Sequence, residues 1–328
     1  MNVLVTGGAG YIGSHLIRVL AGAGHSCVVY DNLISGHREA VGDAATFVRG
    51  DLLRTGHLAR VLREHAIDAV INMASFIEAG ESVEQPLKYF GNNTLGGLSL
   101  LEAMAQTGVK RMVFSSTAAV YGQPESVPIL ETARTEPINP YGASKLCVEH
   151  MLPGFATANQ MGFVSLRYFN VAGAHPTGEV GEAHKSETHL IPLVLQVPLG
   201  QRAGIKIFGE DYDTPDGTCI RDYIHVMDLA AAHVLALQAV EPGQVKVYNL
   251  GNGEGFSVKE IIQTCREVTG HAIPAELSPR RPGDPPRLVA SCEKAQRELS
   301  WRPQYADIRT IVQHAWNWHR EHPKGYSV

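Results

Sequence analysis

The first 31 residues constrain the fold of this chain more than any other segment does. Residues 2–5 are apolar and predict a short buried strand, and a glycine-rich run follows it directly. Residues 12–23 have the periodicity of a helix, and a second apolar run over residues 26–30 ends in Asp31. The pattern predicts a strand–helix–strand unit whose turn carries glycines at positions 7, 10 and 13. Such a unit is typical of an α/β protein with a doubly wound parallel sheet.

This turn has the chemistry of a dinucleotide-binding site. A tight turn after the first strand requires a residue without a Cβ atom, and a pyrophosphate must approach the backbone closely to meet the N–H groups of the helix N-terminus. Asp31 lies 18 residues beyond Gly13, where a carboxylate can accept both adenosine ribose hydroxyls and would repel a 2′-phosphate. The acid therefore favours NAD over NADP. Gly7, Gly10 and Gly13 are spaced G-x-x-G-x-x-G rather than G-x-G-x-x-G, and by themselves would also suit an ordinary strand–turn–helix.

Composition and charge exclude several classes of protein. With 328 residues the chain can form one large or two medium domains, and its net charge of −5 gives no reason to expect a nucleic-acid-binding surface. The five cysteines are scattered without a C-x-x-C pair, which favours a reducing compartment over a disulfide framework or a zinc site. Because the N-terminus enters a strand at once and no apolar run reaches the roughly 18 residues of a membrane helix, we expect a cytoplasmic protein without a signal peptide or membrane span.

Further apolar runs extend the predicted sheet. Strands are expected at residues 45–49, 69–74, 111–117, 164–170 and 245–250, the last as a return strand. Helices are expected at residues 58–65, 82–107, 227–239 and 258–269, and from Tyr141 onward. Asp51 follows the third strand, where it would contact the adenine amino group or, as an alternative of equal weight, cap a helix.

One polar pair interrupts the predicted helix over residues 82–107. Asn92 and Asn93 fall in its middle, where Asn is a poor helix former, whereas Pro86 near its start is tolerated. A polar side chain at such a place often points at a ligand, so Asn92 is a candidate site residue. A simple solvent-facing position is the alternative.

Hydroxyl groups and a Tyr–Lys pair occupy the edge where open α/β sheets bind ligands. Ser115, Ser116 and Thr117 end the fifth strand, and Tyr141 and Lys145 share one face of the next helix. A phenol with a pKa near 10 is a poor base at neutral pH. A lysine ammonium one turn away and a positive nicotinamide ring would lower that pKa and make Tyr141 a general base. Because Tyr-x-x-x-Lys occurs often by chance, this prediction depends on the dinucleotide turn and the hydroxyl groups.

Composition changes after the sixth strand. Residues 173–188 carry Gly, Pro, acids and two His and predict a long loop, residues 205–208 predict a strand, and residues 291–322 predict a helical region with packing tryptophans. We therefore expect two interleaved parts. A dinucleotide-binding domain takes residues 1–175 with a return at 222–250, and a smaller α/β substrate domain takes 176–221 and 251–328.

Two arginines in separate loops are candidates for binding a diphosphate. The guanidinium groups of Arg221 and Arg281 could clamp it, because their forks match phosphate oxygens; two surface salt bridges are the alternative. The 15 histidines show no H-E-x-x-H or other metal spacing, so we expect no metal site.

Taken together, the motifs resemble those of a known family. They are T-G-G-A-G-Y-I-G-S-H at 6–15, D-N-L at 31–33, S-S-T at 115–117 with V-Y-G at 120–122, N-P-Y-G-A-S-K at 139–145, R-Y-F-N-V-A-G at 167–173, D-G-T-C-I-R-D-Y-I-H-V at 216–226, Y-N-L-G at 248–251 and R-R-P-G-D at 280–284. With them the chain resembles, nearly end to end, the extended short-chain dehydrogenases/reductases and among these the UDP-glucose 4-epimerases. The first motif and Tyr-x-x-x-Lys are shared by the whole superfamily, whereas the stretch at 216–226 is specific.

The resemblance implies a Rossmann-type fold and a role for each matching residue. Tyr141 would take the proton of the sugar 4′-hydroxyl, Thr117 would hydrogen-bond that hydroxyl, and Lys145 would bind the nicotinamide ribose. Hydride would pass to bound NAD and return to the opposite face of a 4-keto sugar. Cofactor contacts are implied for Gly7, Gly10, Tyr11, Ile12, Gly13, Asp31, Asn32, Asp51, Leu52, Asn92, Ser115, Tyr141, Lys145 and Tyr168. UDP-sugar contacts are implied for Asn92, Thr117, Asn170, His189, Leu190, Phe208, Arg221, Tyr223, Arg281, Asp284 and Leu288.

Relatives commonly dimerise by pairing the helices near 84–105 and 141–158 into a four-helix bundle.

Two departures from the family pattern bear on the cofactor and the sugar. Ile77 stands where many relatives carry a lysine that contacts the cofactor ribose, which implies looser cofactor retention. Leu288 stands where some relatives carry a tyrosine that narrows the sugar pocket, which implies room for a 2′-acetamido group and hence for UDP-N-acetylglucosamine and its galacto isomer.

Three other functions were weighed against 4-epimerisation of UDP-glucose. A UDP-pentose 4-epimerase differs only in pocket shape and remains open. A nucleotide-sugar 4,6-dehydratase needs an acid–base pair beside the hydroxyl, and Ala118 and Ala119 follow Thr117 instead. A non-catalytic NAD-binding sensor would be expected to lose Tyr141 or Lys145, and both are present.

Overall fold

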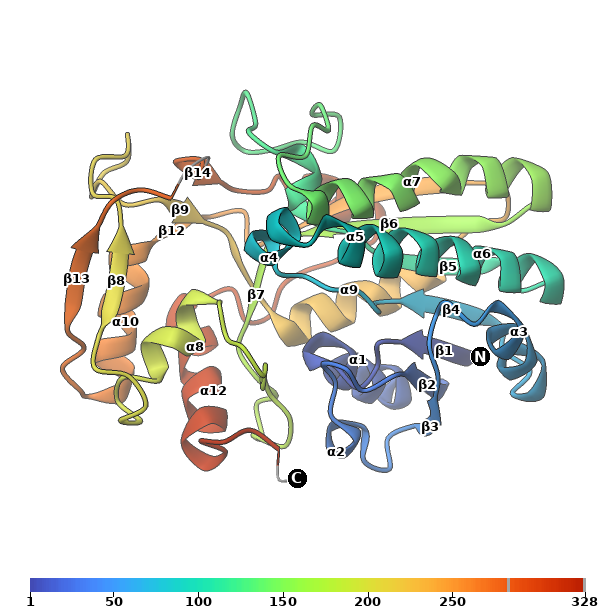
Figure 1. Ribbon diagram of the computed structural model, residues 1–328, viewed down its shortest axis with the longest axis horizontal. Coiled ribbons are helices and arrows are strands. Elements are labelled where there is room, and N and C mark those ends of the chain that lie inside the picture. Colours follow the sequence, from blue (N-terminus) through green and yellow to red (C-terminus); the bar gives the residue numbers. More distant parts are fainter. Residues whose placement is uncertain (282–283, 327–328) are drawn as a thin grey trace.

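A seven-stranded parallel sheet lies at the centre of the molecule, as the computed structural model shows for residues 1–281 and 284–326 (Figure 1). Its strand order is β11-β6-β5-β4-β1-β2-β3. The strands are β1 (Asn2–Thr6), β2 (Ser26–Asp31), β3 (Thr46–Arg49), β4 (Ala69–Asn72), β5 (Arg111–Ser115), β6 (Gly162–Tyr168) and β11 (Val245–Leu250). Short apolar runs such as Val3–Val5 are buried on both faces, which is the pattern of a parallel sheet covered by helices. The predicted fold class is confirmed.

Helices cover both faces of this sheet (Figure 1). One face packs against α1 (Tyr11–Gly22), the short α2 (Arg38–Val41) and α9 (Val226–Gln238), and the other packs against α3 (Thr55–Glu64), α6 (Gly96–Thr107) and α7 (Pro140–Asn159). The two apolar cores between sheet and helices hold the strands in register. As a result, the carboxyl ends of β1, β2, β4 and β5 come together at one edge, where the crossover helices begin.

The predicted helical region over residues 82–107 is largely confirmed, with one break and one π-helical turn. The chain forms α4 (Ala79–Glu84), α5 (Pro86–Tyr89), a π-helical turn η1 (Phe90–Leu95) and then α6. Gln85 leaves the helical conformation because it precedes Pro86, which disfavours the α region for its neighbour. In η1, the side chain of Asn93 accepts a hydrogen bond from Phe76 N (2.9 Å) and donates one to Phe76 O (3.0 Å). The periodicity of the sequence predicts the helix but not the π-helical turn within it.

The predicted helical region over residues 291–322 is also interrupted. It forms α11 (Glu293–Glu298) and α12 (Ile308–Glu321), and the segment between them is irregular. Trp301 in that segment is 1% exposed and its Nε1 donates to the carbonyl of Asp228 at 3.0 Å. The Asp228 carboxylate accepts the backbone N–H groups of Gln304 (2.7 Å) and Tyr305 (2.9 Å), so contacts with α9 take the place of helical hydrogen bonds.

A smaller set of elements lies at one end of the main sheet (Figure 1). It contains α8 (Leu190–Leu195), α10 (Val258–Thr269) and α12, with three small sheets. These sheets pair β8 (Ile205–Phe208) with β13 (Ala275–Ser278), β7 (Asn170–Ala172) with β10 (Tyr223–His225), and β9 (Ile220–Arg221) with β12 (Phe256–Ser257) and β14 (Arg287–Leu288). A third apolar core joins α8, α10, α12 and β8.

The chain passes between these two regions several times, and Asp222 joins three of the passages. Its buried carboxylate accepts backbone N–H groups from Asn252 (2.5 Å), Gly253 (3.1 Å) and Ala290 (3.0 Å).

Within the described ranges, no helix is long and apolar enough to span a membrane.

Candidate active site

The glycine turn between β1 and α1 has no room for side chains. Gly7 has a φ of +71°, and a Cβ atom on it would lie 2.7 Å from the backbone nitrogen of Ala74. A Cβ atom on Gly13 would lie 2.5 Å from the carbonyl oxygen of Gly7. Gly10 is the N-cap residue of α1, so the first N–H groups of the helix have no side-chain cap. This cradle fits the pyrophosphate of a dinucleotide.

Asp31 stands beside this turn at the end of β2. Its carboxylate accepts the backbone N–H groups of Ala9 (3.1 Å) and Leu33 (2.8 Å), and it is 8% exposed. Burial raises the pKa of Asp31, and the two hydrogen bonds act in the opposite direction. The acid is therefore positioned at the carboxyl edge of the sheet, next to the N-terminus of α1, as the ribose-binding prediction requires.

Asn32 and Asp51 meet at the neighbouring strand ends. The Nδ2 group of Asn32 donates to Asp51 at 3.2 Å, and Asp51 also accepts the backbone N–H of Leu53 at 2.9 Å. The helix-cap alternative for Asp51 does not hold, because the N-cap residue of α3 is Arg54. Leu52 is buried against Gly96 of α6.

Tyr11 and Ile12 open α1 at the same edge. Ile12 packs against the core, whereas the Tyr11 hydroxyl donates to the carbonyl of Gly173 at 2.7 Å. Tyr11 thereby joins the dinucleotide turn to the loop that follows β7.

The predicted catalytic side chains converge beyond β5. Tyr141 follows Pro140 at the start of α7, where Asn139 caps the helix by accepting the N–H of Gly142 at 2.8 Å. The Tyr141 side chain forms a hydrogen bond with that of Thr117, and its ring centroid lies 6.5 Å from that of Tyr89. Lys145, 3% exposed, donates from Nζ to the carbonyl of Ser115 at 2.8 Å.

Burial is the largest influence on the pKa values of this pair in the protein alone. Burial raises the pKa of Tyr141 to about 12, although its hydrogen bond with Thr117 acts to lower it. Burial lowers the pKa of Lys145 to about 7, with the charge of Glu149 opposing the change. The lowering of the Tyr141 pKa by Lys145 together with a nicotinamide ring stays a prediction, because in the protein alone Lys145 is not among the groups that shift this pKa.

Ser115 and Tyr168 lie close behind this pair. The Oγ atom of Ser115 is 2.9 Å from Nε2 of His233, whose pKa burial lowers to about 4. Burial raises the pKa of Tyr168 far above 10, and Tyr141 adds to that increase. Both residues are thus near enough to the Tyr141–Lys145 pair to line the same pocket.

Asn92 and its neighbour have different positions. Asn92 Nδ2 donates to Oδ1 of Asn93 at 2.9 Å, while Asn93 is buried and also donates to Ser144 Oγ at 3.0 Å. Sequence reasoning named Asn92 and missed Asn93, which connects η1, the segment after β4 and the catalytic helix. Ile77 lies in that segment, after Phe76, and is 38% exposed.

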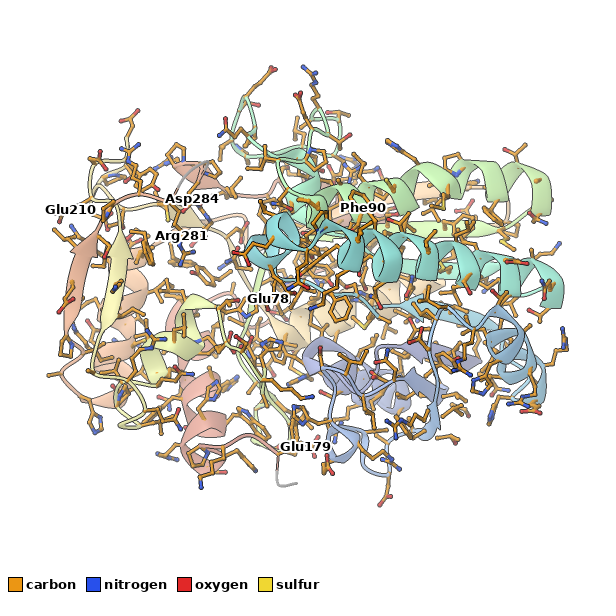
Figure 2. All side chains as sticks on the ribbon, in the orientation of Figure 1. Glu78, Phe90, Glu179, Glu210, Arg281 and Asp284 are labelled. Carbon is orange, nitrogen blue, oxygen red and sulfur yellow. The ribbon has the colours of Figure 1, made fainter. Side chains whose placement is uncertain are left out.

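Of the predicted diphosphate-binding residues, Arg281 lies near Asp284 beside the small sheets (Figure 2), and Arg221 lies in one of these sheets. Arg221 in β9 donates to the Asp284 carboxylate (2.5 Å) and the Pro285 carbonyl (2.8 Å), and the Arg281 guanidinium lies 4.2 Å from the ring centroid of Phe208. Burial raises the pKa of Cys219, and the charges of Arg221, Asp284 and Arg281 all act on that thiol. Pro282 and Gly283 of the same motif lie outside the described residues.

The remaining predicted residues frame this group. Asn170 in β7 pairs with Tyr223 in β10, and Leu288 in β14 pairs with Arg221. His189 is the N-cap residue of α8, which begins at Leu190. The His189 Nδ1 atom lies 2.8 Å from Glu187 Oε1, so its side chain already has an acidic partner.

Comparison with known proteins shows the family of this chain. The model of the family described as "NAD dependent epimerase/dehydratase family" matches residues 3–251. The chain belongs to this family. A curated UDP-glucose 4-epimerase of Halalkalibacterium halodurans is 55% identical over 329 residues, covering 100% of this chain and 98% of that protein.

Solved structures of the epimerase/dehydratase family have the same fold. A UDP-glucose 4-epimerase from Brucella ovis in complex with NAD is 47% identical, with a TM-score of 0.93 over 96% of this chain and 97% of the other. One from Bifidobacterium longum in complex with NAD⁺ and UDP is 39% identical, with a TM-score of 0.94 over 99% and 100%. The cofactor of this family member is NAD, in agreement with Asp31 and the glycine turn.

A buried ionic network behind the active site of this epimerase/dehydratase was not foreseen. The Arg167 guanidinium contacts the Glu149 carboxylate with Nη2–Oε2 at 2.5 Å, and both side chains are less than 10% exposed. Ser116 donates to the same carboxylate, and Arg167 donates to the Tyr121 hydroxyl at 3.0 Å. A glutamate two turns of helix after Tyr141 was the available signal, but its partner lies in another strand.

Proposed function

We propose that this protein catalyses the reversible 4-epimerisation of UDP-glucose and UDP-galactose through a transient 4-keto sugar. The observation that carries the proposal is the convergence of Thr117, Tyr141 and Lys145 beside the glycine turn and Asp31. The family membership and the full-length similarity to UDP-glucose 4-epimerases support it.

The residues that would hold NAD lie at the carboxyl ends of the main-sheet strands and near the starts of α1 and α7. The N-terminus of α1 would receive the pyrophosphate at Gly7, Gly10 and Gly13, Asp31 would accept the adenosine ribose, and Asn32 and Asp51 would border the adenine. Lys145 and Tyr168 would border the nicotinamide ribose. When bound, NAD supplies a hydride acceptor and a positive charge near Tyr141.

Tyr141 is the proton acceptor in this proposal. Its hydrogen-bonded partner Thr117 would share the 4′-hydroxyl of the sugar and hold it toward the phenol. The lysine stays useful even with a lowered pKa, because its ammonium donates to the Ser115 carbonyl and its remaining protons can reach a ribose hydroxyl.

UDP would be held by the small-sheet side of the site. Arg221 and Arg281 are suited to a diphosphate, Phe208 offers a ring, and Asn170, His189, Leu190, Tyr223 and Asp284 border the same region. An anchored nucleotide would let the keto sugar turn over and accept the returning hydride on its other face.

Leu288 supports a wider sugar range within this proposal. A leucine leaves more space than the tyrosine that some relatives carry, so UDP-N-acetylglucosamine and UDP-N-acetylgalactosamine would also be substrates. A UDP-pentose is the second candidate, because the same catalytic groups would act on it.

The domain division and the oligomer also remain proposals. Residues 1–175 with 222–250 would bind NAD, and 176–221 with 251–328 would bind the UDP-sugar. A homodimer would bury the exposed apolar side chains of the α4–α6 region, namely Val83, Leu87, Leu95 and Leu98, which are 40–87% exposed. We also propose a cytoplasmic location, on the grounds of the scattered, unpaired cysteines.

The test uses the protein as purified, with no NAD added. It is incubated with UDP-galactose and, separately, with UDP-N-acetylgalactosamine, and the products are separated by chromatography. Formation of UDP-glucose is expected and would show that NAD remains bound. A product lighter by one water molecule would indicate a dehydratase. If the protein turned over only UDP-pentoses, even with NAD supplied, its substrate would be a UDP-pentose and not UDP-glucose.

A further inference from the structure

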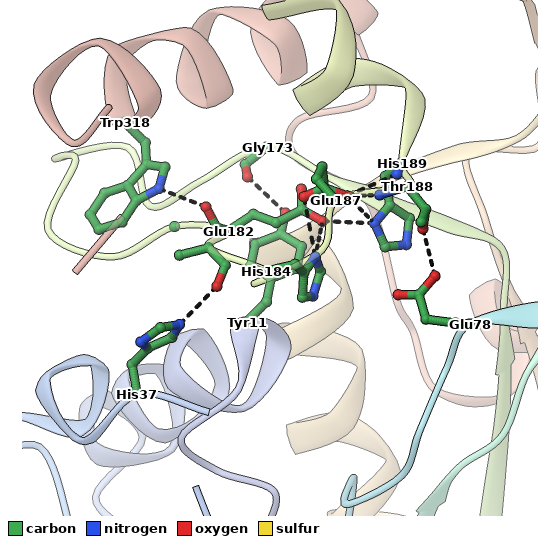
Figure 3. Close-up of polar contacts among 12 residues, drawn as sticks. Tyr11, His37, Glu78, Gly173, Glu182, His184, Glu187, Thr188, His189 and Trp318 are labelled. Atoms are coloured by element: carbon green, nitrogen blue, oxygen red, sulfur yellow. Dashed lines mark hydrogen bonds and ion pairs between the residues drawn. The ribbon is translucent and has the colours of Figure 1, made fainter. Parts of the chain in front are cut away.

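Four ligand-type side chains meet in the loop between β7 and α8 (Figure 3). They are Glu182, His184, Glu187 and His189, in the pattern E-x-H-x-x-E-x-H. One oxygen or nitrogen atom from each lies within 4.8 Å of the corresponding atoms of the others. In the proposed reaction His189 only borders the UDP region, and the other three side chains have no role.

The shortest contacts within the cluster are of the size found around one metal ion. Glu182 Oε1 lies 3.1 Å from Nδ1 of both histidines, the His184 Nδ1 atom lies 3.3 Å from Glu187 Oε2, and the His189 Nδ1 atom lies 2.8 Å from Glu187 Oε1. Zinc binds histidine nitrogen and carboxylate oxygen at about 2.0–2.2 Å, so neighbouring ligands of a tetrahedral site are about 3.3 Å apart. The cluster is already close to that size.

A second observation concerns the Glu182 carboxylate. Glu182 is only 3% exposed, and among the described residues its buried Oε1 atom has only the two histidine Nδ1 atoms as partners, each 3.1 Å away and outside hydrogen-bond geometry. A buried carboxylate is costly unless it is well paired. A cation between the four side chains would bind this oxygen directly.

We propose that Glu182, His184, Glu187 and His189 bind one Zn²⁺-like divalent transition-metal ion in a closed, tetrahedral structural site. Imidazole and carboxylate ligands suit zinc, and four protein ligands leave no position for a reacting water. Two carboxylates and two neutral imidazoles also balance the charge of the dication. This site revises the expectation that the histidines serve no metal.

The site would hold the loop against the proposed cofactor and substrate regions. The Glu182 carbonyl accepts Nε1 of Trp318 in α12 at 2.9 Å, and Thr188 donates to the Glu78 carboxylate at 2.6 Å. Tyr11 donates to Gly173 at the other end of the loop. With Nδ1 on the metal, His189 keeps its Nε2–H group for a ligand at the start of α8.

The first measurement is the metal content of the complete protein. The protein is expressed with zinc in the medium, desalted, and analysed for zinc by mass spectrometry and for bound NAD. One zinc ion per chain is expected. In His184→Ala and Glu187→Gln the zinc content should fall at least tenfold, whereas His271→Ala and Glu276→Gln, which change exposed residues outside the cluster, should keep it. Equal zinc in His184→Ala and the unchanged protein would overturn the proposal.

The second measurement does not depend on any variant. After removal of metal with a chelator, Co²⁺ is added to the unchanged protein and the visible spectrum is recorded. Tetrahedral cobalt should give intense d–d bands at one equivalent. The proposal is overturned if the spectrum shows only the weak bands of hydrated, six-coordinate cobalt and the first measurement finds no zinc. The cluster would then consist of histidine–glutamate ion pairs only. Because metal content is measured separately from turnover, failure of this proposal leaves the proposed epimerase function untouched.

Discussion

The phenol of Tyr141 shows how a side chain depends on more than its neighbours in the sequence. Burial raises its pKa to about 12, so in the protein alone it stays protonated at neutral pH. Activation then has to come from positive charge brought in with the cofactor, in addition to the hydrogen bond with Thr117. In the proposed reaction Thr117 would hold the sugar hydroxyl toward the phenol and would not itself ionise.

Replacement of Tyr141 by phenylalanine tests its role directly. General acid–base catalysis contributes about 10²–10⁴-fold, so kcat for UDP-galactose should fall by at least 100-fold in Tyr141→Phe while bound NAD, measured after denaturation, stays the same. The matched control is Tyr305→Phe, whose ring packs against His225 and His314. Loss of activity below tenfold would remove Tyr141 as the base.

Lys145 makes stability depend on pH. Its pKa is about 7 in the folded chain against 10.5 as the ordinary value, so between these pH values the unfolded state binds more protons and stability rises with pH. We expect the free energy of unfolding of the cofactor-free protein, measured with urea, to increase between pH 7 and 10. Relative to the Lys145→Met variant, the increase should reach up to about 1.4 kcal/mol per pH unit. Identical pH profiles for the two proteins would contradict the lowered pKa.

Leu288 tests the width of the sugar pocket. In Leu288→Tyr, kcat/KM for UDP-N-acetylgalactosamine should fall about 10–200-fold, because a steric difference of this kind is worth about 1–3 kcal/mol. Activity toward UDP-galactose should change less than threefold. Leu277→Tyr on the exposed surface serves as control. A parallel loss for both sugars would mean that Leu288 only supports β14.

At the scale of elements, a single π-helical turn connects two parts of the candidate site. The π-helical turn η1 places Asn93 against both Phe76 and Ser144, and so connects the segment after β4 to the catalytic helix α7. π-helical turns inside helices occur frequently at functional sites. The helical periodicity of the sequence does not distinguish such a turn from an ordinary α-helix.

The Glu149–Arg167 pair connects α7 to β6 and should couple their stabilities. Removing one partner leaves a buried charge unpaired, so Glu149→Met and Arg167→Met should each lower the free energy of unfolding by about 3–5 kcal/mol. The double variant should be destabilised by clearly less than the sum, as measured by urea unfolding in a double-mutant cycle. Additive losses would show that the two charges are independently hydrated.

At the scale of the whole molecule, the exposed apolar side chains of the α4–α6 region indicate a partner surface. Leu95 and Leu98 are 56% and 40% exposed and point away from the core of their own chain. The double variant Leu95→Glu/Leu98→Glu should convert a dimer to a monomer in sedimentation equilibrium, while Leu277→Glu, 60% exposed elsewhere, should not. Monomeric unchanged protein would refute the dimer.

The sequence by itself determined the parts of this protein that depend on local chemistry. The glycine turn, Asp31, the alternation of strands and helices, and the Tyr141–Lys145 pair follow from backbone sterics and from periodicity within short windows, and these local signals also carry the family resemblance. They specify the sheet, although Thr117 lies just beyond β5, Asn170 lies in β7 and Arg221 lies in β9 rather than in the elements predicted for them.

Only the tertiary structure decided the properties that need distant residues. Asp222 binds segments about 30 and 70 residues away, Arg167 finds Glu149 in another element, and Glu182 meets His189 because a loop folds back. Burial, which is the largest cause of the raised pKa of Tyr141 and of the lowered pKa of Lys145, is likewise a property of the packed molecule. Desolvation and long-range contact have no signature in a short stretch of sequence, because they depend on what the rest of the chain places around a side chain.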